Sequence, residues 1–137
     1  DALPILQLPV SILDQTLIHD GSLTKLKKYG VEIHARSVFL QGLMFMEKDM
    51  IPSYFNPIIK NIDAFQNLAI ELSFSRLELA LSYVASICEI DKIVVGVNTI
   101  NQLKEVIKAA KLRTDFQKHK RISIRNPIYT NPSLWKI

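Results

Sequence analysis

Apolar positions along the chain follow two different patterns. Three short runs rich in apolar residues, at about residues 4–9, 31–36 and 92–96, have the length and composition of strands. Between them, apolar residues recur every three or four positions, as they do on the buried face of a helix. The resulting order is strand, helix, strand, two helices, strand, helix and an irregular tail. Such alternation predicts a parallel sheet whose strands are joined by right-handed crossovers.

The segments between these strands carry signals for where helices begin and end. Ser22 is placed to cap a helix that continues to Tyr29, and Gly30 follows as its C′ residue. Asn56 followed by Pro57 predicts the start of a longer helix. The apolar face expected for this longer helix is formed by Ile58, Ile62, Phe65, Ala69 and Leu72.

Two further helices are expected to begin with a capping box, in which the N-cap residue and the third helical residue satisfy each other's backbone amides. One box lies at residues 75–78 and the other at residues 99–102. The first helix should extend towards Ile90 and bury Cys88 on its apolar face. The second should end near Ala110.

The predicted sheet is too small to stand alone. Parallel barrels filled by side chains use about eight strands, so three strands cannot close one. A three-stranded sheet has two unpaired edges and a face with nothing packed on it. The sequence therefore predicts an α/β chain whose residues 1–137 form part of a larger fold.

Composition excludes several classes of protein. Of the 137 residues, 48% are hydrophobic and 22% are charged, which is typical of a globular domain. No apolar run reaches the roughly 20 residues that span a bilayer, so no membrane anchor is expected. The single cysteine leaves no internal disulfide to form and fits the reducing cytoplasm. Cys and His residues lack the spacing of a zinc site, so no metal centre is expected.

The net charge of +4 is compatible with a polyanionic partner or with a phosphorylated small molecule. Much of the excess positive charge lies at residues 108–113 and 118–121. These segments lack the interleaved aromatic residues that stack on bases. Solvated surface charge is therefore favoured over nucleic-acid binding.

Candidate chemistry is expected where the parallel strands end, because ligands of such folds bind there. Side chains alternate along a strand, so Glu32, His34 and Arg36 share the polar face of the second strand. Arg36 then lies at the carboxyl end of this strand, where a ligand is expected. Its guanidinium group can bind a phosphate, a carboxylate or an aromatic ring there. His34 is interpreted as an interior residue paired with Glu32 rather than as a general base.

The third strand ends in Gly96 and leads into a capped helix. A helix N-terminus that follows a glycine turn is suited to binding an anion. The simpler interpretation is that Asn98 and Thr99 only satisfy the amides of the helix itself.

Four segments resemble the aldo-keto reductase superfamily in their order and spacing. They are LQLPVSILD at residues 6–14, HARSVFLQGL at 34–43, IVVGVNTINQL at 93–103 and NPSLW at 131–135. The resemblance implies a (β/α)8 TIM barrel, of which this chain would be the C-terminal portion. Strands six, seven and eight of that barrel would lie at about residues 4–9, 31–36 and 92–96.

The family reduces carbonyl groups with NADPH, and its catalytic tetrad of Asp, Tyr, Lys and His lies on the earlier strands. No residue of this chain matches any of those four motifs, so the resemblance implies no catalytic residue here. It implies a cofactor-binding role, with a small-molecule carbonyl as the substrate of the complete enzyme.

The implied cofactor contacts begin at the nicotinamide end. Gln7 would bind the nicotinamide carboxamide, and Arg36 stands where many members stack an aromatic residue on the nicotinamide ring. The loop that would embrace the pyrophosphate supplies Ser37, Phe39, Gln41 and Gly42.

The contacts implied for the adenosine end follow the third strand. Gly96, Asn98 and Gln102 match the turn near the adenosine phosphate, and Glu105 matches a residue that binds adenine. Gly96 and Gln102 stand where some members place Lys and Arg on the 2′-phosphate. The family's use of NADPH makes NADP the expected cofactor, and the lack of Lys and Arg at these two positions makes NAD the alternative.

The resemblance predicts the C-terminal, cofactor-binding portion of an NAD(P)H-dependent oxidoreductase. The remaining N-terminal strands of the barrel, or another subunit, would have to cover the sheet. The alternative is a non-catalytic binding or regulatory module derived from the same fold. A basic domain that binds nucleic acid is a third interpretation, which the charge pattern does not favour.

Overall fold

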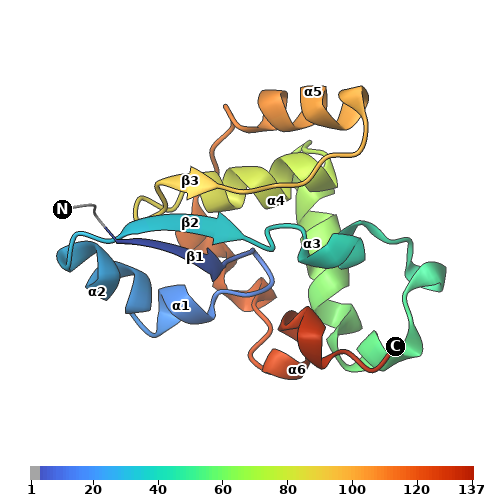
Figure 1. Ribbon diagram of the computed structural model, residues 1–137. Helices are drawn as coiled ribbons and strands as arrows, with labels where there is room; N and C mark the ends of the chain where they lie inside the picture. The colour runs from blue at the N-terminus through green and yellow to red at the C-terminus, as the bar shows by residue number, and fades with distance from the viewer. Residues whose placement is uncertain (1–3) are drawn as a thin grey trace.

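The fold is built on a three-stranded parallel sheet (Figure 1). The computed structural model describes residues 4–137, without the side chains of residues 116 and 117, so the first three residues of the predicted domain lie outside the described part. The strands β1 (Ile5–Pro9), β2 (Glu32–Arg36) and β3 (Lys92–Ile93) lie in the order β1-β2-β3. Both pairings are parallel, which confirms the predicted topology.

The third strand is shorter than the predicted run at residues 92–96. Its ladder with β2 contains only two residues, followed by one more backbone hydrogen bond from Val94 to Ala35 at 2.8 Å. The reason lies in β2, which ends at Arg36. Ser37 then adopts a positive φ of 58° and turns the chain away, so residues 95 and 96 have no strand to pair with.

Helices connect the strands. Their bounds are α1 Thr16–His19, α2 Ser22–Lys28, α3 Ile59–Glu71, α4 Arg76–Ala85, α5 Ile100–Ala109 and α6 Pro127–Thr130. Short 3-10 segments cover residues 40–45, 48–50, 53–58, 116–122 and 132–134. Across residues 4–137, every helix falls short of the length and apolar character that crossing a bilayer requires.

Two predicted helix starts are wrong in detail. Ser22 is the first residue of α2 and caps nothing, because Gly21 occupies the N-cap position with a positive φ of 75°. Asn56 and Pro57 lie inside a 3-10 segment, and the α-helix begins only at Ile59. The predicted end of α2 is confirmed, since Gly30 follows it with φ 73°.

The capping box of α4 is confirmed. The Glu78 amide donates to Ser75 Oγ at 3.0 Å, and the Ser75 amide donates to a Glu78 carboxylate oxygen at 2.8 Å. The helix ends at Ala85, earlier than predicted. Cys88 therefore lies beyond it and is exposed, with its thiol donating to the Glu89 carboxylate, so the expectation of a core cysteine is wrong.

The irregular tail contains short helical turns, and aromatic side chains hold its last residues in place. Trp135 packs edge-on against Phe55 with the ring centroids 4.8 Å apart, and its indole N–H donates to the Tyr129 carbonyl at 3.1 Å. Tyr54 adds a hydrogen bond from its hydroxyl to the Ile128 carbonyl at 2.9 Å. The C-terminal residues are therefore tied to the segment before α3.

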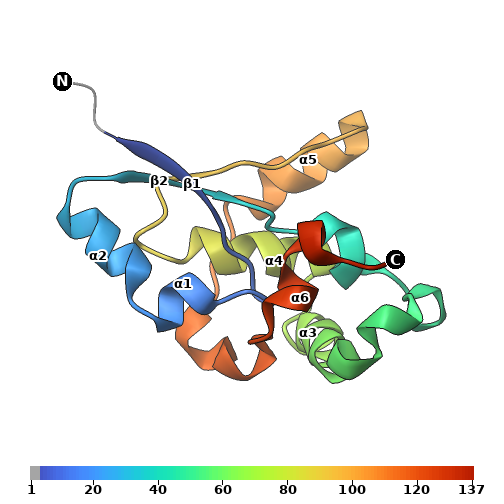
Figure 2. The ribbon, with the colours of Figure 1, turned by 60° about the horizontal axis from the view of Figure 1, so that its bottom comes forward.

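The sheet has one buried face and one open face. Figure 2 shows α1, α2 and α4 on the same side of the strands, where Ile33 and Ala35 are completely buried. On the other face, the Glu32 carboxylate accepts hydrogen bonds from His34 Nε2 at 2.7 Å and from Lys92 Nζ at 2.9 Å. The predicted pairing of His34 with Glu32 is thus confirmed, and the open face is lined by charged groups.

A carboxylate outside the ladder reinforces the centre of the sheet. Asp91 Oδ2 accepts a hydrogen bond from the Ile33 amide at 2.7 Å and an ion pair from Lys27 Nζ at 2.8 Å. These two contacts lower the pKa of Asp91 below its ordinary value of 3.8, because both favour the charged form. Such a carboxyl group stabilises the folded state at pH values above the pKa that it has in the unfolded chain. The stabilisation is lost as the pH falls through the lower pKa that it has in the folded protein.

The Asp91→Asn variant should therefore have a smaller free energy of unfolding than the native protein at pH 7. The deficit should shrink as the pH falls from 5 towards 3, because the native protein loses its own contribution there. Urea unfolding at a series of pH values measures this, with Asp49→Asn, an exposed carboxylate, as the control. A deficit that stays constant over that range would contradict the assignment.

Candidate functional site

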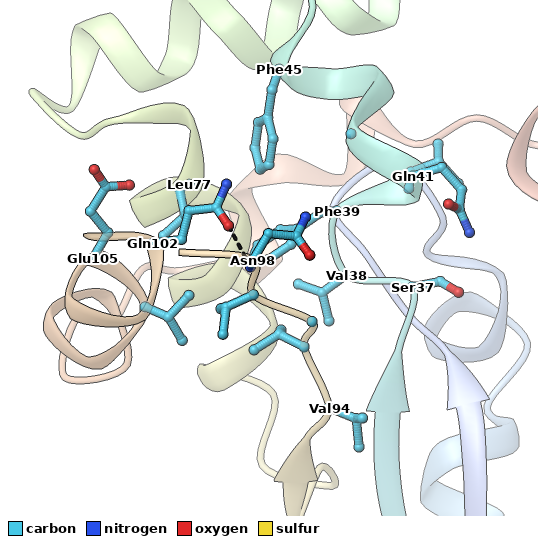
Figure 3. A pocket seen from close by; sticks show the side chains of 16 residues that line it. Ser37, Val38, Phe39, Gln41, Phe45, Leu77, Val94, Asn98, Gln102 and Glu105 are labelled. Atoms are coloured by element: carbon cyan, nitrogen blue, oxygen red, sulfur yellow. Dashed lines mark hydrogen bonds between the residues drawn. The ribbon is translucent and has the colours of Figure 1, made fainter. Parts of the chain in front are cut away.

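A hollow lies where β2 and β3 end. Its volume is about 540 Å³, and Figure 3 shows the side chains that line it. One wall is the loop that follows β2, and the other is the segment between β3 and the first two turns of α5. The lining residues are Ser37, Val38, Phe39, Leu40, Gln41, Gly42, Phe45, Leu77, Val94, Val95, Gly96, Val97, Asn98, Gln102, Glu105 and Val106.

The loop after β2 holds a strained backbone. Ser37, Leu40, Gln41 and Gly42 all have positive φ, at 58°, 46°, 54° and 79°. Such conformations cost about 1–3 kcal/mol for residues other than glycine and persist only where the surroundings enforce them. They are concentrated at ligand-binding sites, so this loop is a functional candidate on geometric grounds.

Packing and side-chain hydrogen bonds enforce that conformation. Leu40, Leu43 and Met44 are fully buried and anchor the loop in the core. Gln66 Nε2 donates to the Met44 carbonyl at 3.3 Å, and Arg76 Nη1 donates to the Phe45 carbonyl at 2.8 Å. The wall is therefore fixed by contacts from α3 and α4 before any ligand binds.

The opposite wall is built by the start of α5. The Gln102 amide donates to Thr99 Oγ1 at 3.1 Å, and Gln102 Oε1 accepts the Asn98 amide at 2.8 Å. The predicted capping box is thus half right, because Gln102 reaches Asn98 rather than Thr99. Thr99 caps one amide of its own helix, as the simpler interpretation held for this residue, whereas Asn98 takes part through its backbone amide. Gly96 leaves open space, since a Cβ placed there would meet no atom within 4 Å.

The lining of the hollow is about equally polar and apolar, and its apolar part centres on two aromatic rings. Phe39 and Phe45 pack together with ring centroids 5.2 Å apart at an interplanar angle of 51°. Val38 is buried, while Phe39 is half-buried. A flat ring with apolar faces can pack against such a surface. Among the lining residues, Glu105 is the sole ionisable one, and its side chain is exposed.

Eight of the ten residues predicted to bind the cofactor line this hollow. They come from both walls, and Figure 3 shows Ser37 and Gln41 on one side with Gln102 and Glu105 on the other. The eight are Ser37, Phe39, Gln41, Gly42, Gly96, Asn98, Gln102 and Glu105. The fold therefore brings together residues 37–42 and 96–105, two segments that lie more than 50 residues apart in sequence.

The other two residues, Gln7 and Arg36, lie outside the hollow. Gln7 pairs with His34 in the sheet register and is exposed. Arg36 ends β2, and its guanidinium donates to Ser37 Oγ at 3.3 Å. Arg36 lines a second hollow of about 340 Å³, which Ser37 shares and which the tail residues 127 and 130–132 help to close.

Several apolar residues that line the hollow are not identified by any pattern in the sequence. Phe45 and Leu77 reach the hollow from the 3-10 segment after β2 and from the first turn of α4. In the sequence, Leu77 is one of several apolar positions of a helix. The residues next to it in sequence do not show whether such a position lines a hollow or lies in the core. Within the described part of the chain, no three His, Cys, Asp or Glu residues group together in a way that could hold a metal ion.

Comparison with known proteins identifies the architecture. No family model and no curated protein matches the sequence. Among solved structures, the holo form of aldo-keto reductase AKR11C1 from Bacillus halodurans is 16% identical and superposes with a TM-score of 0.69, over 88% of this chain and 43% of that one. Glycerol dehydrogenase AKR11B4 from Gluconobacter oxydans is 18% identical, with a TM-score of 0.67 over 93% of this chain and 43% of that one.

A third similar structure is the thermostable aldo-keto reductase Tm1743 in complex with the inhibitor epalrestat. It is 18% identical and has a TM-score of 0.63, over 86% of this chain and 38% of that one. The three parallel strands and their helices thus have the fold of the C-terminal part of an aldo-keto reductase (β/α)8 barrel. The chain spans less than half the length of each of these structures.

Two glycines in the hollow allow the backbone strain to be measured. A Cβ at Gly42 or at Gly96 would meet no atom within 4 Å, but only Gly42 has a positive φ, of 79°. Gly42→Ala should therefore lower the free energy of unfolding by about 1 kcal/mol, whereas Gly96→Ala should change it by less than about 0.5 kcal/mol. Chemical unfolding measures both, and equal losses would contradict the assigned loop conformation.

Proposed function

We propose that this chain is the C-terminal, cofactor-binding portion of an NAD(P)H-dependent oxidoreductase that reduces aldehyde or ketone groups. The observation that carries the proposal is the convergence of a strained loop, a glycine turn and a helix N-terminus on one hollow at the carboxyl edge of a parallel sheet. Sheets of this kind bind dinucleotides at that edge.

The lining residues fit the parts of a dinucleotide. The hollow has the volume of a small-molecule site, with an apolar surface at Phe39 for a flat ring. The Leu40 and Gly42 amides bond within the loop, and the other backbone amides at residues 37–42 suit phosphate oxygens. Asn98 and Glu105 suit the hydrogen-bonding groups of ribose and adenine. When bound, the nicotinamide would supply the hydride that reduces the carbonyl.

The nicotinamide end is assigned to the open side of the sheet, beyond the hollow. Arg36 ends β2 beside Ser37, and Gln7 faces the same side one strand away. Since Ser37 borders both hollows, an extended cofactor held at residues 37–42 reaches past Arg36. The carbonyl substrate would then bind near that end, with the tail residues 130–132 beside it.

The proton donor for carbonyl reduction is assigned to a part of the enzyme outside this chain. The remaining barrel strands, or another subunit, would supply it and would also cover the sheet. Exposed apolar side chains support the proposal that further elements cover this part of the chain. Leu6 on β1 is 40% exposed. On α5, the exposed fractions are 73% for Ile100, 44% for Leu103 and 55% for Ile107. Further strands and helices would bury this surface. The single cysteine is compatible with a cytoplasmic enzyme.

Charge in the hollow bears on which nucleotide it takes. The residues that line it include no Lys or Arg, so the hollow itself offers a 2′-phosphate no cation. NADPH gains its preference over NADH from such a cation in other dinucleotide-binding sites. We therefore expect the two nucleotides to bind with similar affinity.

Glu105 gives a direct test of the proposed site. Glu105→Gln should weaken NADPH and NADH binding about tenfold, because a hydrogen bond to a charged group contributes about 1.5–3 kcal/mol. Glu71→Gln, which removes an exposed carboxylate at the end of α3, is the matched control and should leave the affinity unchanged. Titration of nucleotide fluorescence with the complete protein measures both.

Two results would count against the proposal. The first is saturable binding of an unrelated cofactor with no binding of NADPH or NADH. The second is an equal effect of the Glu105 and Glu71 variants, which would show that the substitutions act through net charge alone.

A further inference from the structure

A basic hollow lies away from the hollow at the ends of β2 and β3. It is formed where α1 and the residue after it face the tail, and its volume is about 530 Å³. Its lining residues are Thr16, His19, Asp20, Lys120, Ser123 and Arg125, none of which lines the hollow at the ends of β2 and β3. The two walls are about 100 residues apart in sequence, so this grouping is a product of the fold.

Buried contacts fix the two walls against each other. The Ile124 amide donates to the Leu13 carbonyl at 2.8 Å, which ties the tail to the segment before α1. Gln15 is completely buried, and its Nε2 donates to the carbonyls of Ile12 at 2.8 Å and His119 at 3.0 Å. Because a buried amide is costly to leave unsatisfied, these bonds hold the walls firmly in place.

The tail segment is anchored on its other side as well. Ile122 and Ile124 are buried in the core on either side of Ser123. Asn61 on α3 donates from Nδ2 to the carbonyls of Ile122 at 3.2 Å and Ser123 at 3.3 Å. The Ser123 side chain is thereby positioned at the hollow by contacts that do not involve it.

Positive charge in this hollow is poorly compensated. Lys120 and Arg125 form no ion pair or side-chain hydrogen bond with any described side chain, unlike the paired Lys27, Lys48 and Lys92. Asp20 is the acidic residue of the lining, and its carboxylate is already engaged by the Ser22 amide at 2.8 Å. Two cations against one carboxylate leave the lining with a net positive charge, which attracts an anion.

We propose that this hollow binds the phosphate group of a small phosphorylated molecule. Arg125 offers a planar set of donors that matches phosphate oxygens, and Lys120 offers a compact charge. The hydroxyl groups of Thr16 and Ser123 complete a set of donors around the anion. The volume exceeds that of one phosphate group, which leaves room for an attached organic portion.

Arg125 and Arg121 form a matched pair for the test. Both are exposed residues of the tail, and only Arg125 lines the hollow. Inorganic phosphate is titrated into the full protein at constant ionic strength, with chloride as the balancing anion, and backbone amides are followed by NMR. Saturable shifts are expected at residues 16–20 and 120–125.

Arg125→Gln should weaken phosphate binding at least about tenfold, and Arg121→Gln should weaken it less than about twofold. Equal weakening by the two variants, or shifts that do not saturate, would overturn the proposal by showing general surface attraction. Tighter binding of a short single-stranded DNA that spreads over residues 108–121 would overturn it in favour of a nucleic-acid surface.

This test is independent of the proposed dinucleotide site. Arg125→Gln should leave NADPH affinity unchanged, since Arg125 lines neither the hollow at the ends of β2 and β3 nor the hollow beside Arg36. Phosphate shifts confined to residues 37–42 and 94–105 would assign the phosphate to the dinucleotide site and overturn the second site.

Discussion

The central position of β2, paired in parallel with both neighbours, is the constraint on which the candidate site depends. Gln7, His34 and Lys92 lie in one register row across the three strands. Because parallel strands present their carboxyl ends at the same edge, the loop after β2 and the turn after β3 must lie side by side. A ladder of only two residues on β3 is enough to set this arrangement. The walls of the hollow then follow from where each strand ends.

The contrast between the two faces of the sheet governs what can cover it. Ile33 and Ala35 are buried beneath helices, whereas Glu32, His34 and Lys92 form a hydrogen-bonded charged group on the open face. Hydrogen bonds from His34 and Lys92 lower the pKa of Glu32, so this carboxylate is held in its charged form. An apolar layer over that face would leave charges without solvent, which is costly. The covering segments that we propose must therefore bring polar groups of their own.

Much of the fold could be predicted from local pattern, while the site could be predicted only in part. Three strands and the capping box at Ser75 follow from residue type and spacing, because each depends on neighbours in sequence. The length of β3 could not be predicted, since it depends on where Ser37 turns β2 away. Positive φ at Leu40 and Gln41 contradicts local preference, and buried packing enforces it. Phe45 and Leu77 join the hollow through tertiary contacts that no sequence motif reports.

NMR mapping of NADPH on the complete protein tests the central claim most directly. If the dinucleotide binds where the parallel strands end, saturable shifts will appear in two separate segments, at residues 37–42 and 94–105. The amides of α3, none of whose residues lines the hollow, will remain unshifted. Saturable binding of NADPH that leaves both of those segments unshifted would contradict the assignment of the dinucleotide to this edge of the sheet.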